Sequence, residues 1–144
     1  MPAVHHNLAN LLFLSGKVDE AIKSYTTSLE QDPKCADAWY NLGNAFSSKH
    51  DHPKAIKAFK TSLSHDKTNA QCHFNLGNAY FQQKEYSLAI QHYLGSLEAN
   101  ETDSAHLNLA IAYSDLGQSE DAIKHLEQCI ELNPNNEDAL SVLI

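Results

Sequence analysis

The hexapeptide Asn41-Leu42-Gly43-Asn44-Ala45-Phe46 recurs as Asn75-Leu76-Gly77-Asn78-Ala79-Tyr80, which is a shift of 34 residues. Weaker copies stand at Asn7-Leu8-Ala9-Asn10 and at Asn108-Leu109-Ala110-Ile111-Ala112-Tyr113, with offsets of 34 and 33. Self-similarity at a fixed period of this size is the signature of a repeat architecture. The sequence therefore predicts four copies of one structural unit.

Each copy has the apolar spacing of two consecutive helices. Within the second copy the apolar residues fall three, four and seven positions apart, at Trp39, Leu42, Gly43 and Phe46 and then at Ala55, Ile56, Phe59 and Leu63. This spacing is typical of one face of an amphipathic α-helix, repeated twice. Helix breakers fall at the expected joints, with Gly16 and Gly117 inside copies, Pro53 at the start of a second helix, and Pro33 and Pro134 between copies.

Small residues mark the place where the two helices of a copy meet. One column holds Ala9, Gly43, Gly77 and Ala110, and the other holds Ala21, Ala55, Ala89 and Ala122. Small side chains allow two helices to approach closely, whereas a bulky one would push them apart. Each copy is thus predicted to be a tight helical hairpin.

These columns resemble the tetratricopeptide repeat, whose pattern runs W-x2-L-G-x2-Y, then A-x3-F, then P over 34 residues. The second copy matches it in order at Trp39, Leu42, Gly43, Phe46, Ala55 and Phe59. The sequence departs from it where His5, His73 and His106 replace the Trp, where Lys67 and Glu101 replace the Pro, and where one residue is missing between Thr102 and Asp103. The resemblance implies an all-α, right-handed α-solenoid. It would form a single array over 1–144, with repeats at about 2–35, 36–69, 70–102 and 103–136 and a partial or capping helix at 137–144.

In this family the first helices line a concave groove that binds extended peptides. The positions of this sequence that correspond to the groove-lining positions of the family hold seven asparagines: Asn7, Asn10, Asn41, Asn44, Asn75, Asn78 and Asn108. Asparagine is a poor helix former, so its recurrence needs another reason. A carboxamide can both donate and accept, and so can pair with a peptide backbone. The row resembles the asparagine ladder in the repeat superhelix of O-linked N-acetylglucosamine transferase, although nothing here resembles that enzyme's catalytic part.

Aromatic side chains accompany the asparagines on the same expected face. Tyr40 and Phe74 lie beside the asparagines together with the aliphatic Leu107, and Phe13 and Phe81 lie one turn or more away. Aromatic residues gain contact area with few rotatable bonds to freeze, which suits them to hold apolar peptide side chains. The sequence thus favours a scaffold that binds an extended protein segment.

Other interpretations remain open from the sequence. The asparagine amides could bridge neighbouring copies, and Leu107 could belong to ordinary packing. The family's dicarboxylate clamp, which holds acidic chaperone tails, is less favoured because its basic positions are occupied by His6, Tyr40, Gln71, Ser104, Asn75 and Asn108. The chain could also be the substrate-recruiting or regulatory module of a larger, glycosyltransferase-like enzyme.

Composition narrows the classes of partner. The chain has 18 Asp and Glu against 10 Lys and Arg, a formal charge of -8, which disfavours nucleic acid and anionic membrane surfaces. The three cysteines have no C-x-x-C spacing, and His5-His6 and His50-Asp51-His52 lack a third ligand, so no metal site and no cofactor are expected. Enzyme motifs are missing, and no apolar run reaches bilayer length. We expect a non-catalytic, soluble protein of the cytoplasm.

The two ends of the chain are also apolar. The chain opens almost at the first residue of a copy, and it closes on Leu140, Val142, Leu143 and Ile144. Repeats bury their apolar sides only against neighbours, so the end copies need a polar outer face. Either the sequence is a piece of a longer array, or its ends meet another chain, in which case we expect end-to-end self-association at high protein concentration.

Overall fold

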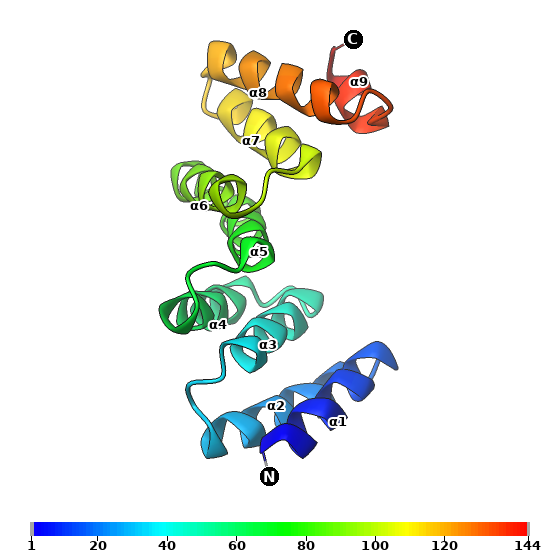
Figure 1. Ribbon diagram of the computed structural model, residues 1–144, viewed down its shortest axis with the longest axis vertical. Helices are drawn as coiled ribbons and strands as arrows, with labels where there is room; N and C mark the ends of the chain where they lie inside the picture. The colour runs from blue at the N-terminus through cyan, green and yellow to red at the C-terminus, as the bar shows by residue number, and fades with distance from the viewer. Residues whose placement is uncertain (1, 144) are drawn as a thin grey trace. The chain divides into compact units, whose positions relative to one another are not determined.

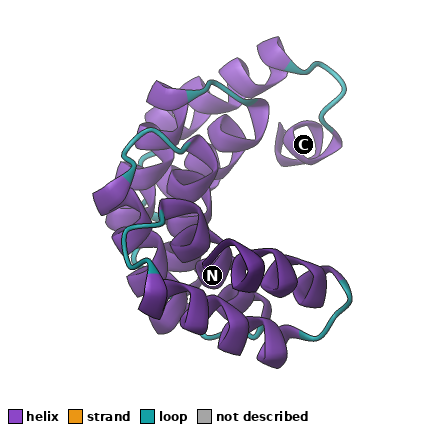
Figure 2. Cartoon of the chain, turned by 60° about the horizontal axis from the view of Figure 1, so that its bottom comes forward, coloured by secondary structure: helices purple, strands orange, loops and turns teal. Residues whose placement is uncertain are grey.

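The computed structural model describes residues 2–143, and every regular element in that range is a helix (Figures 1 and 2). The predicted all-α fold of tandem helical hairpins is confirmed. The four hairpins are α1 (Pro2–Leu14) with α2 (Val18–Gln31), α3 (Ala36–Ser48) with α4 (His52–His65), α5 (Ala70–Gln82) with α6 (Tyr86–Ala99), and α7 (Asp103–Asp115) with α8 (Ser119–Leu132). A shorter helix, α9 (Glu137–Leu143), follows.

The chain divides into two compact units, residues 1–68 and 69–144. The first unit contains the hairpins α1–α2 and α3–α4. The second contains α5–α6, α7–α8 and α9. Each unit buries a core of its own, and each is described separately below.

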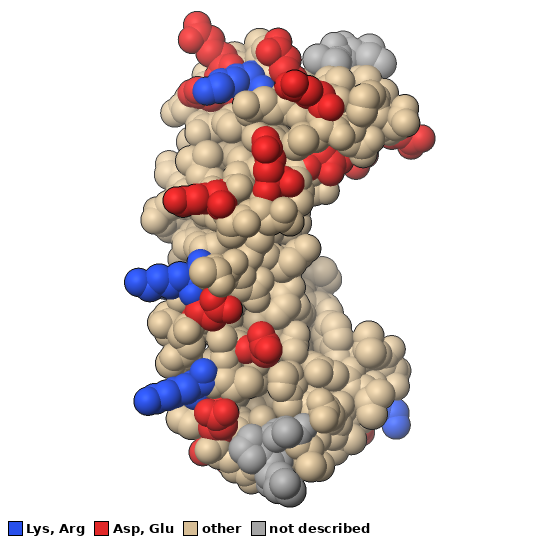
Figure 3. Space-filling model, viewed as in Figure 1, with Lys and Arg blue, Asp and Glu red and all other residues tan. Residues whose placement is uncertain are grey.

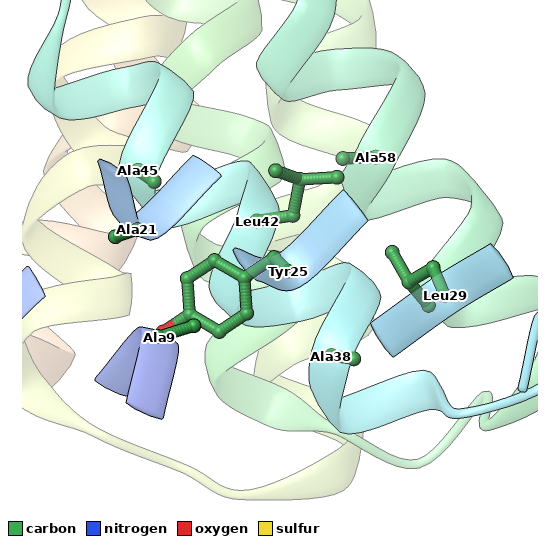
Figure 4. Close-up of a cluster of buried hydrophobic side chains, with 8 residues drawn as sticks. All are labelled: Ala9, Ala21, Tyr25, Leu29, Ala38, Leu42, Ala45 and Ala58. Carbon is green, nitrogen blue, oxygen red and sulfur yellow. The ribbon is translucent and has the colours of Figure 1, made fainter. Parts of the chain in front are cut away.

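The core of the first unit forms where a first helix packs on the hairpin before it. Tyr25 and Leu29 of α2 lie in one buried cluster with Ala38, Leu42 and Ala45 of α3 (Figure 4). The small residues of α3 therefore meet the large residues of α2. The same columns of the repeat are buried in α7, at Ala105, Leu109 and Ala112.

Glycine is required inside each of the two middle hairpins. A Cβ atom on Gly43 would lie 2.5 Å from the ring of Phe59, and one on Gly77 would lie 2.7 Å from the ring of Tyr93 and 3.2 Å from the carbonyl oxygen of Ala89. The predicted close approach is therefore real. Glycine is needed mainly because the aromatic ring of the second helix lies directly over this position.

The turn inside each hairpin needs one residue in the left-handed region. Gly16 and Gly117 have φ angles of 83° and 79° there, as their turn position predicts. The equivalent residues of the middle copies are His50 and Lys84, with φ angles of 59° and 61°. Side chains disfavour this conformation, so the middle turns are strained.

Helix starts are set by local side chains. The carboxylate of Asp51 accepts a hydrogen bond from the backbone N–H of Lys54, with Pro53 in the first turn of α4, as predicted. Asn69 and Thr102 cap α5 and α7 in the same way. Such caps satisfy N–H groups that have no partner within the helix.

The segment before α9 is held by one carboxylate. Oδ2 of Asp103 accepts hydrogen bonds from the side-chain amides of Asn133 at 3.0 Å and Asn136 at 2.9 Å, and these bonds lower the pKa of Asp103. Ala139 of α9 is buried against α8, whereas Leu140 and Val142 are exposed. The side chain of Leu143 and the whole of Ile144, also expected to be apolar surface, lie outside the described residues.

Candidate peptide-binding face of the first helices

The seven asparagines singled out from the sequence all lie on the first helices α1, α3, α5 and α7. We call their positions the amide face. None of these four helices contains Lys or Arg. Asn7 is exposed and the other six are half-buried. The face is therefore polar but without positive charge.

In the first unit, two asparagines are engaged by neighbouring side chains. The hydroxyl of Tyr25 donates a hydrogen bond to Oδ1 of Asn10 at 2.5 Å. The side-chain amide of Asn41 lies 3.0 Å from Nε2 of His6, whose ring meets that of Tyr25 edge to face. The contact of Asn41 with His6 joins the first two copies, which is the bridging role that the sequence left open, whereas the bond of Tyr25 to Asn10 lies within the first copy.

In the second unit, Asn78 is the centre of a similar network. Its Oδ1 accepts a hydrogen bond from the hydroxyl of Tyr93 at 2.5 Å and another from Nδ2 of Asn108 at 3.0 Å. A carboxamide oxygen has two lone pairs, so the acceptor capacity of Asn78 is filled. Asn78 can therefore offer a ligand only its N–H groups.

A pocket of about 180 Å³ opens beside this network. Its lining residues are Asn78, Phe81, Gln82, Tyr93, Asn108 and Ile111. The lining combines side-chain amides with aromatic and aliphatic groups, a combination that can take an apolar side chain and pair with the backbone that carries it. The structure thus brings three of the sequence-predicted residues, Asn78, Asn108 and Phe81, to one pocket.

Burial makes both tyrosines of these networks harder to ionise than an ordinary tyrosine, whose pKa of 10.0 already lies above neutral pH. It raises the pKa of Tyr25 to about 12. Burial also raises the pKa of Tyr93, and a hydrogen bond with the side chain of Asn108 opposes part of that rise. Both hydroxyls remain hydrogen-bond donors at neutral pH.

The other predicted residues lie outside this pocket. Tyr40 packs on Phe59 with ring centroids 6.0 Å apart, and Phe74 packs on Tyr93 at 5.8 Å. Phe74 lines a separate pocket of about 240 Å³ with Asp103. Asn44 and Asn75 each have an interaction partner within the chain.

Two apolar residues that the sequence placed near the asparagines, Phe13 and Leu107, contribute to core packing. Phe13 packs against the core of the first unit. Leu107 is buried in the core of the second, in a cluster with Leu126. For these two residues, packing accounts for their place in the sequence.

Histidines form ring stacks within the second unit. His73 stacks on His92, and His92 on Tyr80, with both pairs of centroids 5.6 Å apart. The equivalent stack joins His106, His125 and Tyr113, and there the two Nδ1 atoms lie 3.0 Å apart while Nε2 of His106 contacts Glu101. The sequence analysis did not predict these stacks.

The described residues contain neither a cluster of metal ligands nor a helix of membrane-spanning character. Between residues 2 and 143, no three His, Cys, Asp or Glu side chains are placed to share a metal ion. Over the same range, no helix combines the length and the apolar character that crossing a bilayer needs.

Reasoning from the sequence missed the tyrosine partners of the asparagines. A signal was present, because Asn10 and Asn78 are each followed fifteen residues later by a tyrosine, whereas Ile111 is followed at that distance by Leu126. The correspondence is partial, because Asn44 is followed at that distance by Phe59. Two further residues complete the pocket. Gln82 lies one helical turn after Asn78, and Ile111 occupies the same repeat position as Asn78 in the last copy.

Helical hairpins in tandem, each with a glycine or alanine under a large side chain, define a class of repeat proteins that act in protein interaction. The tetratricopeptide repeat model matches residues 36–69, 70–103 and 104–136, and a TPR repeat model matches residues 9–50. The chain belongs to the tetratricopeptide repeat family and is, in this general sense, a protein-interaction scaffold.

Solved structures share the fold. A crystal structure of MamA is 26% identical with a TM-score of 0.89, covering 91% of this chain and 77% of that one. A second MamA structure is 24% identical with a TM-score of 0.92, covering 96% of this chain and 76% of the other. PilF of Pseudomonas aeruginosa is 23% identical with a TM-score of 0.82, covering 96% and 64%. No curated protein sequence matches the chain.

Proposed function

We propose that this chain is a non-catalytic scaffold that binds an extended segment of a partner protein on its amide face. The observation that carries the proposal is the pocket beside Asn78 and Asn108, where amides and the Phe81 ring converge. Extended peptides present unpaired backbone N–H and C=O groups together with side chains, and this pocket offers partners for both.

Within the pocket, Asn108 is the residue we expect to pair with the ligand backbone. A carboxamide has two N–H donors and two acceptor positions. Asn108 gives one N–H to Asn78 and also hydrogen-bonds the Tyr93 side chain, and its four positions exceed these two bonds. Asn78, whose acceptor positions are filled, then serves mainly to orient Asn108.

The preferred segment is neutral or basic. The four first helices contain no Lys or Arg, and the chain carries a formal charge of -8. Acidic side chains also predominate over basic ones on the face shown in Figure 3. An acidic tail would meet repulsion and no cationic partner, so the chaperone-tail clamp is disfavoured.

Calorimetry on selected peptides tests this function. Peptides selected from a displayed random library would be titrated into the parent chain, into Asn108→Ala and into the double variant Asn41→Ala, Asn75→Ala. We expect a loss of about 1–3 kcal/mol of binding free energy in each, from lost amide pairing. Asn135→Ala, in an exposed loop off the amide face, is the matched control and should bind normally.

Two outcomes would count against the proposal. Unchanged affinity in correctly folded Asn108→Ala and double variants would exclude backbone pairing by these amides. Micromolar binding of a peptide that ends in two carboxylates, with weaker binding of basic peptides, would contradict the expected charge preference.

A further inference from the structure

Two pockets of the second unit open between the third and fourth copies. The first is the pocket beside Asn78 and Asn108, which we call the amide pocket, with walls from the second half of α5 and the middle of α7. The second has a volume of about 240 Å³ and takes its walls from the opening turns of the same two helices. We call it the acidic pocket, and its lining includes Gln71, Phe74, Asn100, Asp103 and Ser104.

The two pockets are neighbours. Phe74 lines the acidic pocket and Tyr93 lines the amide pocket, and the centroids of these two rings are 5.8 Å apart. On α7, Asp103 of the acidic pocket and Ile111 of the amide pocket are separated by roughly 12 Å along the helix axis. One bound segment can therefore reach both pockets.

This separation determines how far apart the two side chains of a ligand must be. An extended chain rises about 3.1–3.4 Å per residue, so roughly 12 Å corresponds to three or four residues. A side chain three positions further on returns to the same side of a polyproline II segment, and one four positions further on returns to the same side of a β-strand. Both conformations can direct two side chains into the two pockets.

The lining of the acidic pocket is suited to a cation. It offers hydroxyl, carboxamide and carboxylate oxygens, and among its described lining residues none is Lys, Arg or His. The start of α7 contributes a partial positive charge of about half a unit, but the full negative charge of Asp103 outweighs it. Gln71 and Ser104 are exposed, so the pocket can be reached from solvent.

The carboxylate of Asp103 is held in a fixed orientation. Its Oδ2 accepts hydrogen bonds from the side chains of Asn133 at 3.0 Å and Asn136 at 2.9 Å. These bonds, together with the backbone N–H groups of Asp103 and Ser104, favour the charged carboxylate and lower its pKa. A group that is already oriented loses less conformational freedom when it pairs with a ligand.

Phe74 gives the acidic pocket an apolar surface in addition to its carboxylate. The Phe74 side chain is half-buried and lines the pocket together with Asp103. A Lys or Arg side chain can lay its methylene groups along an apolar surface while its charged end reaches a carboxylate, and a cation is attracted to an aromatic face. An acidic side chain would instead be repelled by Asp103.

We propose that the extended segment bound on the amide face carries a Lys or Arg side chain in the acidic pocket, three or four residues from an apolar side chain in the amide pocket. This inference rests on the proposed function and names the class of its ligand. Asp103 and Phe74 then select the basic residue, while Phe81 and Ile111 contact the apolar one. The formal charge of -8 attracts such a segment from a distance.

Selection from a displayed random library gives the first test. Peptides that bind the parent chain should be enriched in Lys or Arg at three or four positions from a Leu, Ile, Val, Met or Phe. Selected peptides without a basic residue at this spacing, or with an acidic one there, overturn the inference.

A double-mutant cycle on the tightest-binding selected peptide gives the second test. Calorimetry would compare this peptide with a variant whose basic residue is replaced by Gln, on the parent chain and on Asp103→Asn. We expect the Gln peptide to bind the parent roughly fivefold more weakly, and to bind Asp103→Asn less than about twofold more weakly. A general disturbance of the segment before α9 by Asp103→Asn affects both peptides equally and cancels in the cycle.

Charge added at the edge of the acidic pocket should have the opposite effect to Asp103. Ser104→Lys places an ammonium group at an exposed position of the lining, and should weaken binding of the basic peptide roughly tenfold with little effect on the Gln peptide. The controls Glu127→Gln and Ser64→Lys alter the charge equally at exposed residues that line neither pocket, and should keep the preference of the parent. Circular dichroism would verify that each variant is folded.

The outcomes separate this inference from the proposed function. If the change to Gln weakens binding equally on the parent and on Asp103→Asn, while Asn108→Ala weakens every peptide, the inference is overturned and the proposed function stands. If no selected peptide binds the parent chain, both are overturned.

Discussion

Tyr93 and Asn78 form the link between the core of the second unit and its amide face. The Tyr93 hydroxyl donates to Oδ1 of Asn78 at 2.5 Å, while the Tyr93 ring lies over Gly77 and against Phe74. The Tyr93 side chain thus both packs within its hairpin and orients the Asn78 amide of the candidate site. The residues of this site therefore affect stability as well as binding.

Replacing Tyr93 by Phe should separate these two roles. The ring would stay, as Phe59 does in the equivalent position, but the hydrogen bond would be lost. We expect the free energy of unfolding in urea to fall by about 0.5–1.5 kcal/mol. Tyr86→Phe is the control, because Tyr86 packs edge to face on Phe81 through its ring. Equal stability of the Tyr93→Phe and parent proteins would mean that the hydrogen bond contributes nothing.

Adding a methyl group at position 77 should destabilise the second unit. The new Cβ in Gly77→Ala would approach both the Tyr93 ring and the backbone oxygen of Ala89, and a backbone atom cannot move aside easily. Overpacking of this kind costs about 1–3 kcal/mol. Thermal and urea unfolding measure it, with the exposed helical substitution Ser114→Ala as reference. A stability gain would show that the hairpin has room to open.

Glycine at position 84 should stabilise the chain. Lys84 is exposed and has a φ of 61°, a conformation that destabilises the folded state by about 1–2 kcal/mol for any residue with a side chain. Glycine removes this cost, but its greater freedom in the unfolded chain offsets about 0.5–1 kcal/mol of the gain. We expect Lys84→Gly to raise the free energy of unfolding by about 0.5–1 kcal/mol. Gly117→Ala, the reverse change at an equivalent turn, should lower it. If both substitutions act in the same direction, turn strain is not the cause.

Stability should decline as the pH falls below neutrality. Burial, then the neighbouring charges of His106 and Lys124, lower the pKa of His125 below its ordinary value of 6.5, while Asp121 opposes this. The unfolded chain therefore binds the proton more readily than the folded one. The contribution is fully present above pH ~6.5 and is lost as the pH falls through the folded-state pKa.

Urea unfolding from pH 7.5 to 5.5 would measure this dependence. His125→Gln should flatten the profile, whereas the same change at His65, an exposed residue at the end of α4, should leave the slope closer to that of the parent. An identical slope in the His125→Gln protein would exclude His125 as the source.

The sequence by itself determined the hairpins, their order and their small-residue contacts. These features depend on spacing along one helix or between adjacent helices, and a 34-residue period repeats that spacing four times. Gly16 and Gly117 were likewise recognisable, because a left-handed turn favours glycine for local reasons.

Only the tertiary structure decided what the asparagines do. Whether Oδ1 of Asn78 is open to a ligand depends on Tyr93 from α6 and Asn108 from α7, which donate to it at 2.5 and 3.0 Å. Side-chain pairing of this kind is set by how three helices pack together. The same holds for the contact between the Nδ1 atoms of His106 and His125, because the recurrence of histidine at one repeat position does not show which atoms of the two rings are in contact.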